Sequence, residues 1–178
     1  MSLDVALSDR TVDLVEDGFD LALRITRSPH PTLIQRKLAT TRLIVCASPG
    51  YLGRRGTPNT PKDLATHDVI AYSYWASGDD WEFDGPDGHE SVRIRPRMRA
   101  NNGDTCVATA LQDQGVVLQP SFLVGDDLRT GRLVELLPGY SMPEAGVHAV
   151  YASRKHMPLK VRKLIDFLVE AFQKPVWE

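Results

Sequence analysis

The stretch that decides the fold reads RANNGD from Arg99 to Asp104, TCVATALQDQ from Thr105 to Gln114, and GVVLQP from Gly115 to Pro120. Its pattern predicts a strand, a tight loop, a helix, a glycine stop and a second strand. Gly115 is expected to take a positive φ just after the helix, and the short apolar run that follows is typical of a core strand.

The helix in this stretch carries its own start signal and its own apolar face. Asn101 or Asn102 can cap it by accepting a hydrogen bond from a backbone N–H one turn on. Val107, Ala108 and Leu111 follow at helical spacing and are expected to face the core.

The start of such a helix can bind a small anion. Its first N–H groups lack partners within the helix, and the positive end of the helix dipole faces the carboxyl edge of the sheet. The alternative is an ordinary strand–helix–strand unit whose helix start faces water, and the pattern alone favours that alternative.

Length and composition fit a folded chain of one or two domains. Of the 178 residues, 42% are hydrophobic and 25% are charged, which is ordinary globular composition. The net charge of −2 gives no electrostatic attraction for nucleic acid. No apolar run approaches the ~18 residues that span a membrane. The N-terminus lacks the features of a secretory signal, so we expect a cytoplasmic protein.

The sequence lacks the usual marks of an enzyme. Cys46 and Cys106 are too few for a disulfide framework and lack metal-ligand spacing, and their apolar neighbours are typical of free core cysteines. We find no nucleophile elbow, no glycine-rich phosphate loop and no metal cluster. We therefore expect no catalysis, cofactor or metal, although a dyad of Cys46 with a histidine stays an alternative.

The N-terminal part is expected to form a parallel strand–helix–strand unit. Asp4–Leu7 reads as a short strand, and Ser8 or Asp9 as the cap of a helix that runs to about Glu16. Phe19–Ile25 reads as the second strand. The short helical crossover between the two strands favours parallel pairing.

Turn and cap signals divide the middle of the chain. Residues 33–48 read as two strands or one bent ribbon, and Ser48-Pro49 and Thr60-Pro61 each begin a short helix. Further strands are expected at Val69–Tyr74, Trp81–Phe83 and Ser91–Ile94, the last two forming an antiparallel hairpin.

The C-terminal part is expected to alternate helices and strands. Ser121 can cap a helix that runs to about Thr130, and Leu133–Leu137 and Val147–Tyr151 read as strands. The final helix begins near Pro158. Its apolar stripe consists of Val161, Leu164, Ile165, Leu168 and Phe172.

Five segments, taken in order, carry a family resemblance that covers nearly the whole chain. They are Val12–Arg24, Arg42–Leu52, Ala100–Asp104, Leu133–Pro138, and the Val150-Tyr151 strand with the terminal helix. Together they resemble the effector-binding domain of LysR-type transcriptional regulators.

The resemblance implies an α/β fold of two Rossmann-like lobes of the periplasmic-binding-protein (type 2) kind, joined by two crossover strands. Lobe I is expected at residues 1–46 and 149–178, and lobe II at residues 47–148. A small effector, expected to be an organic anion such as a carboxylate, is bound between the lobes to control transcription. The family also implies a homodimer or tetramer.

The sequence departs from the family pattern at its start. The family's N-terminal winged helix-turn-helix is absent, so DNA contact is expected only through that missing domain. The first strand and helix of lobe I are also expected to be missing, which leaves one strand edge open.

In lobe I, the resemblance implies ligand contacts at Ser8, Asp9 and Arg24. For the Ser8-Asp9 turn the alternative is a simple helix cap. Arg24 follows an apolar strand and needs an anionic partner or an exit to water. A ligand carboxylate is one partner, and an internal pair with Asp9 or Asp20 is the alternative.

In lobe II, the ligand-binding candidates cluster at two helix starts. Asn101, Asn102 and Gly103 lie where the central helix begins. Pro120 and Ser121 begin the next helix on the same edge and are expected to form the floor of the pocket.

Other polar and aromatic residues favour structural roles. Asp104 is expected to complement the helix dipole, Tyr74 and Trp75 to pack against the core rather than wall the pocket, and His148 to be a structural strand residue. A basic group near the last helix reads as a solvated face and not as a nucleic-acid site: Arg154, Lys155, His156, Lys160, Arg162 and Lys163.

The leading hypothesis is therefore the small-molecule sensor of a bacterial transcription regulator. The alternative is a stand-alone or periplasmic solute-binding protein with the same lobes. An enzyme is the third hypothesis, and the motifs favour it least.

Overall fold

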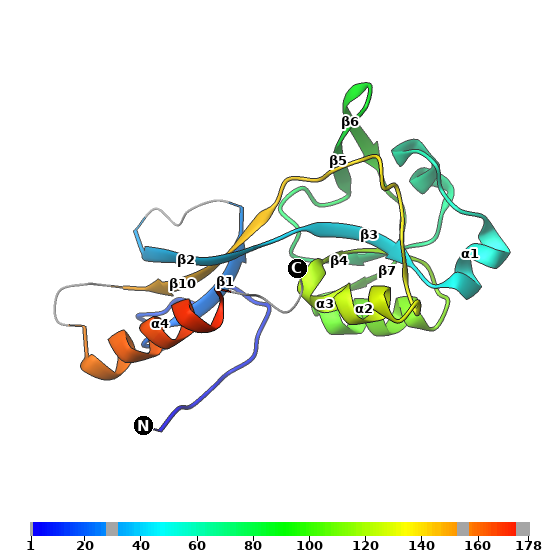
Figure 1. The fold of residues 1–178 in the computed structure, drawn as a ribbon. Helices are drawn as coiled ribbons and strands as arrows, with labels where there is room; N and C mark the ends of the chain where they lie inside the picture. Colours follow the sequence, from blue (N-terminus) through cyan, green and yellow to red (C-terminus); the bar gives the residue numbers. More distant parts are fainter. Residues whose placement is uncertain (1, 28–31, 153–156, 174–178) are drawn as a thin grey trace. The chain divides into compact units, whose positions relative to one another are not determined.

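The computed structural model describes residues 2–27, 32–152 and 157–173. These residues form two compact units (Figure 1). Among the described residues, unit 1 comprises those up to Thr41 and from Glu144 onward, and unit 2 comprises Arg42–Pro143. The chain passes from one unit to the other after Thr41 and after Pro143, a few residues before the lobe boundaries expected from the sequence. Across the described residues, every helix is too short or too polar to span a bilayer.

Unit 1 is built on a three-stranded antiparallel sheet. Its strand order is β1 (Ala22–Thr26), β10 (Ala145–Tyr151) and β2 (Ile34–Thr41). Helix α4 (Leu159–Ala171) packs its buried face against the sheet, as its apolar spacing predicts. The cluster under it consists of Tyr151, Val161 and Ile165, with Leu21, Ile34, Met157 and Val169 at its margin.

The prediction of a parallel strand–helix–strand unit at the N-terminus is wrong. Residues 4–7 form no strand, and the side chains of Val5 and Leu7 are 71% and 95% exposed. No helix follows Ser8 and Asp9. Strand propensity alone does not make residues 4–7 a strand, because a strand needs a partner. Strand β1 pairs antiparallel with β10, and residues 4–7 pair with no strand.

A hydrogen-bonded turn takes the place of the expected helix. The Asp13 carboxylate accepts hydrogen bonds from the backbone N–H groups of Val15 (2.8 Å) and Glu16 (3.1 Å). The N–H of Phe19 donates to the carbonyl of Leu14 at 2.9 Å. Leu14 is buried and anchors this turn. The hydrogen bonds to the Asp13 carboxylate replace those that a continued helix would make.

Unit 2 contains a mixed five-stranded sheet with the order β7-β4-β8-β3-β9. Strands β7 (Pro96–Ala100), β4 (Val69–Tyr72) and β8 (Val116–Pro120) are mutually parallel. Strand β3 (Leu43–Ala47) pairs antiparallel with β8, and the edge strand β9 (Val134–Glu135) pairs antiparallel with β3. The expected strand–helix–strand unit is therefore present, with β4 inserted between its two strands.

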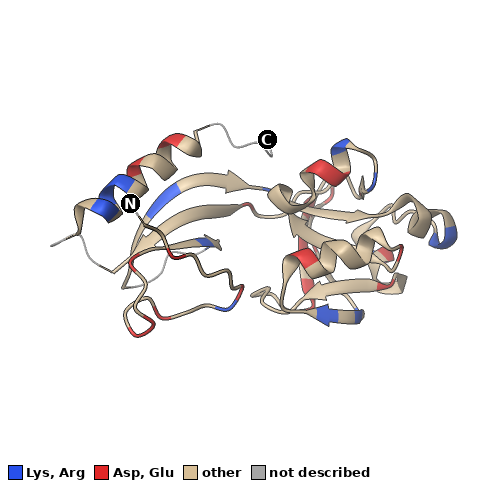
Figure 2. Cartoon of the chain, turned by 90° about the horizontal axis from the view of Figure 1, so that it is seen from below, with Lys and Arg blue, Asp and Glu red and all other residues tan. Residues whose placement is uncertain are grey.

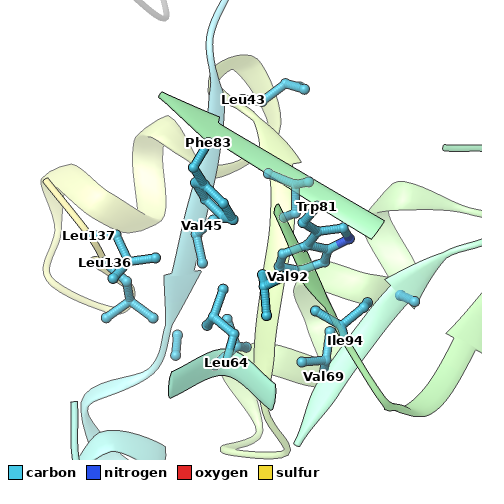
Figure 3. Packing of buried hydrophobic residues seen from close by; sticks show 14 of the residues in the cluster. Leu43, Val45, Leu64, Val69, Trp81, Phe83, Val92, Ile94, Leu136 and Leu137 are labelled. Carbon is cyan, nitrogen blue, oxygen red and sulfur yellow. The ribbon is translucent and has the colours of Figure 1, made fainter. Parts of the chain in front are cut away.

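Each face of this sheet buries its own apolar cluster. On one face, the hairpin β5 (Asp80–Gly85) and β6 (Gly88–Arg93) and the short helix η1 (Pro61–Thr66) cover the sheet. Figure 3 shows the side chains of Trp81 and Phe83 among those of Val45, Leu64 and Val92. On the other face, α2 (Gly103–Leu111) and α3 (Ser121–Arg129) pack over residues that include Ile44 and Val117.

Local cap signals account for most helix boundaries. The hydroxyl of Ser48 accepts a hydrogen bond from the N–H of Tyr51, which begins α1 (Pro49–Arg55), and Thr60 begins η1 with a capping box. Helix α3 differs from expectation, because its N-cap is Pro120 and Ser121 is its first residue. The strand expected at Leu133–Leu137 shortens to β9.

The apolar face and the end of α2 also differ from expectation. Ala108 is exposed, and the buried residues are Gly103, Cys106, Val107 and Ala110. After the helix, Asp113 takes the left-handed conformation with φ of 59°, and Gly115 has the positive φ that was expected, at 159°.

Gly115 serves close packing. A Cβ placed there would lie 2.5 Å from the carbonyl oxygen of Asp68, which accepts the N–H of Val116 at 2.9 Å. The backbone between α2 and β8 therefore approaches the segment before β4 more closely than any side chain allows.

We predict that Gly115→Ala lowers the free energy of unfolding by about 2 kcal/mol, because the new methyl meets backbone that cannot move aside. Gly53→Ala is the matched control, since the space around Gly53 inside α1 is open. The control is expected to raise stability by up to about 1 kcal/mol. Urea unfolding measures both, and equal effects of the two variants would contradict the packing account.

Candidate functional site

The carboxyl ends of three parallel strands meet at one edge of the unit 2 sheet. Strands β4, β7 and β8 end there at Tyr72, Ala100 and Pro120. The N–H of Ser73 donates to the carbonyl of Ala100 at 2.9 Å, which ties the ends of β4 and β7 together. In open α/β sheets, ligands bind preferentially at such an edge.

Helix α2 begins at this edge with an asparagine cap, as predicted. The Oδ1 atom of Asn102 accepts hydrogen bonds from the backbone N–H of Thr105 (2.9 Å) and from its hydroxyl (3.0 Å). The N–H of Asp104 has no hydrogen-bond partner among the described residues. Because Asp104 is exposed, that donor can reach a ligand.

Pro120 and Ser121 lie beside this helix start. Both are buried, and the N–H of Ser121 donates to the carbonyl of Arg42 at 2.8 Å. Gly103 is also buried, and a Cβ added to it would lie 2.7 Å from the Cδ1 atom of Leu123 in α3. The structure therefore brings the predicted residues of lobe II together where α2 and α3 begin.

Gln119 is a residue of this edge that the sequence reasoning missed. Its side chain is 1% exposed, and its Nε2 atom has no hydrogen-bond partner among the described residues. A buried unpaired donor costs about 1–3 kcal/mol, so the position is notable. The available signal was a single amide in the otherwise apolar run VVLQP.

The charges near the helix start are either paired or acidic. Arg99 on β7 contacts the Asp79 carboxylate at 2.6 Å, and this hydrogen bond holds the pKa of Asp79 below its usual value. Asp104 lies in the first turn of α2, where it complements the helix dipole as expected. Attraction of an anion to this edge therefore depends on backbone N–H groups and the dipole.

The predicted residues of lobe I lie in unit 1. Ser8 is exposed, and its hydroxyl accepts the N–H of Arg10 at 3.2 Å. Asp9 is also exposed. Arg24 is half-buried and donates from Nη2 to the carbonyl of Val12 at 2.5 Å. Asp20, one of its expected partners, pairs with Lys160 at 3.0 Å. The ligand roles of Ser8, Asp9 and Arg24 stay predictions.

Of the two aromatic residues after β4, Trp75 packs against the core as expected and Tyr74 does not. Trp75 is half-buried against the cluster around Trp81, and its ring meets that of Tyr72 edge-on with centroids 5.5 Å apart. The indole Nε1 of Trp75 is buried without a partner among the described residues. Tyr74 is 47% exposed at the same strand end.

Two surface hollows of about 470 Å³ lie elsewhere. One in unit 1 is lined by Gln35, Arg36, Tyr151, Met157, Arg162, Ile165 and Asp166. The other, beside η1 and β6, is lined by Ala65, Thr66, Arg93, Ile94 and Arg95. Neither includes a predicted ligand residue.

His148 and the basic group near the last helix were expected to have structural roles, which stay predictions. His148 lies in β10, and burial with the nearby Lys37 lowers its pKa. Acidic and basic positions are interspersed along the described chain (Figure 2). Arg154, Lys155 and His156 lie outside the described residues.

The cysteines lack the properties of a nucleophile. Burial, with Glu135 and Asp127 nearby, raises the pKa of the Cys46 thiol to about 12. Both Cys46 and Cys106 are fully buried. A thiol of this kind is protonated at neutral pH and unavailable for attack.

We predict that neither thiol of the native chain reacts with a disulfide reagent within minutes at pH 8. Both are expected to react at once in denaturant, because unfolding removes the burial that protects them. The absorbance of the released chromophore counts the thiols. Rapid, stoichiometric labelling of Cys46 in the native chain would support the dyad alternative instead.

Comparison with known proteins identifies the family. The family model described as "LysR substrate binding domain" matches residues 1–173. DmlR, an HTH-type transcriptional regulator of Escherichia coli K12, is 35% identical over 174 residues, which cover 97% of this chain and 56% of that protein. LtrA, a probable HTH-type transcriptional regulator of Klebsiella pneumoniae, is 35% identical over 167 residues, with 92% and 54% covered. The chain thus spans about half the length of these relatives.

Solved structures agree with the sequence matches. Full-length AphB, a Vibrio cholerae virulence activator of the LTTR family, has a TM-score of 0.81 at 25% identity, covering 95% of this chain and 57% of that one. The regulatory domain of CrgA, a LysR-type regulator from Neisseria meningitidis, has a TM-score of 0.79 at 33% identity, covering 89% and 78%. The chain therefore belongs to the LysR substrate-binding domain family.

Proposed function

We propose that this chain is the effector-sensing part of a LysR-type transcription regulator and that it binds a small organic anion. The observation that carries the proposal is the edge where β4, β7 and β8 end, with the first turn of α2 facing it. Asn102 satisfies one N–H of that turn, and the exposed Asp104 leaves another unpaired.

A carboxylate fits this edge for physical reasons. An anion at a helix N-terminus gains about 0.3–1 kcal/mol at an exposed site and up to about 2 kcal/mol when partly buried. Arg99 is already paired with Asp79. The ligand carboxylate would therefore accept hydrogen bonds from neutral backbone N–H groups and not from the Arg99 guanidinium. Such a site suits a small anion held by several hydrogen bonds.

Sensing requires that the ligand prefer one conformation of the chain over another. A preference of about 1–3 kcal/mol is a typical allosteric coupling and is sufficient to alter transcription. The relatives are named as HTH-type regulators, and this chain spans about half their length. We therefore propose that a separate N-terminal domain binds DNA and that the protein is cytoplasmic. We also propose that it assembles as a dimer or tetramer and has no enzymatic activity.

The experiment uses Asn102→Asp, which keeps the cap and adds a negative charge. Aspartate caps helices as well as asparagine, so stability is expected to stay unchanged or to rise slightly. Two like charges about 4 Å apart repel by roughly 4 kcal/mol at an effective dielectric of about 20, so anion affinity is expected to fall more than tenfold. Thermal shift with a library of organic acids measures binding, since ligand at about 100 times Kd adds roughly 2.7 kcal/mol.

Two further variants separate charge from stability. Asn102→Ala removes the cap and is expected to cost about 1 kcal/mol of stability. Asn59→Asp makes the same charge change at an exposed residue before η1 and is expected to leave binding unchanged. If Asn102→Asp binds every wild-type ligand with unaltered affinity, the ligand does not sit at the start of α2.

A further inference from the structure

The side chain of Gln119 lies on a face of the sheet that is otherwise covered by apolar side chains. It pairs directly with Ile44 across β3 and β8, and directly paired residues point to the same face. That face carries the apolar cluster of Ile44, Cys46, Val117 and others under α2 and α3. A leucine would fit this environment without leaving a polar atom unpaired.

The amide of Gln119 lies against the first residue of α2. Its Oε1 atom would be 3.2 Å from a Cβ built on Gly103. A carbonyl oxygen is the favourable group to face the positive end of a helix, so the Nε2 donor points elsewhere. Nε2 is buried and has no hydrogen-bond partner among the described residues.

We propose that Gln119 determines ligand specificity by donating a hydrogen bond from Nε2 to a second oxygen of the bound acid. The ligand class is a small carboxylate that carries a second oxygen. This oxygen is a hydroxyl or carbonyl on the α carbon, which bears the carboxyl group, or on the β carbon beside it. This inference rests on the proposed function, because it places the carboxylate at the start of α2.

The geometry supports two separate contacts for one ligand. The backbone N–H of Asp104, an exposed residue of the first turn, supplies a donor for the carboxylate. The Gln119 amide, beside Gly103 of the same turn, supplies the second donor. A site with a buried donor disfavours a ligand that leaves this donor unpaired.

The experiment compares matched acids on wild type and Gln119→Leu. The probes are lactate with propionate, malate with succinate, and 2-hydroxybenzoate with benzoate, measured by calorimetric titration. For the pair that binds, wild type is expected to prefer the oxygenated acid by about tenfold, and Gln119→Leu by less than about twofold. Gln119→Met serves as a second apolar variant if leucine disturbs the fold.

Gln112→Leu is the matched control, since it makes the same exchange at an exposed residue after α2. It is expected to keep the wild-type preference. Thermal unfolding supplies an independent readout: Gln119→Leu is expected to be at least as stable as wild type, because it removes a buried unpaired donor.

A wild type that binds both members of every pair equally, or a preference that persists in Gln119→Leu and Gln119→Met, overturns the role of Gln119. Neither result affects the proposed function if Asn102→Asp still lowers acid affinity more than tenfold. No binding by any of the six acids overturns the ligand class, and the wider library with Asn102→Asp then tests the proposed function alone.

Discussion

The parallel pairing of β4 with β7 on one side and β8 on the other is the constraint on which the candidate site depends. Parallel strands end at one edge, so this pairing fixes where α2 and α3 begin. The register is held by buried apolar residues on both faces, among them Val69, Ile70 and Val116. A shift by one residue would turn these side chains to the wrong face, so the core that stabilises unit 2 also positions its polar edge.

The polar edge differs in character from the core beneath it. Core positions of β8 are filled by side chains without unpaired polar atoms, whereas Gln119 retains an unpaired amide donor at the end of the strand. Helix α2 begins beside it, and the N–H of the exposed residue Asp104 has no hydrogen-bond partner among the described residues. The buried Gln119 donor costs free energy in the unliganded chain, and a small anion with a second oxygen can satisfy both groups.

The sequence predicted unit 2 better than unit 1 for a physical reason. Helix starts such as Ser48-Pro49 and Asn102, and the hairpin of β5 and β6, follow from short-range cap and turn chemistry, and the structure confirms them. The strand expected at residues 4–7 required a neighbouring strand, and pairing between distant segments is not encoded in local pattern. The same limit hid the insertion of β4 between β7 and β8.

The family resemblance carried part of the prediction that local pattern could not. Five segments in order indicated the LysR substrate-binding domain, and the family match over residues 1–173 confirms it. Asn102 could be predicted as a cap from the residues themselves. Gln119 could not be singled out, because only the structure shows that its amide is buried beside Gly103 and unpaired.

The most direct measurement of the central claim is an amide proton–nitrogen NMR titration with an acid that raises the melting temperature. Ligand at the start of α2 predicts the largest shift changes at the backbone amides of Gly103, Asp104 and Thr105 and at the side-chain amide of Gln119. Shift changes confined to unit 1, with these four signals unmoved at saturation, would contradict the account.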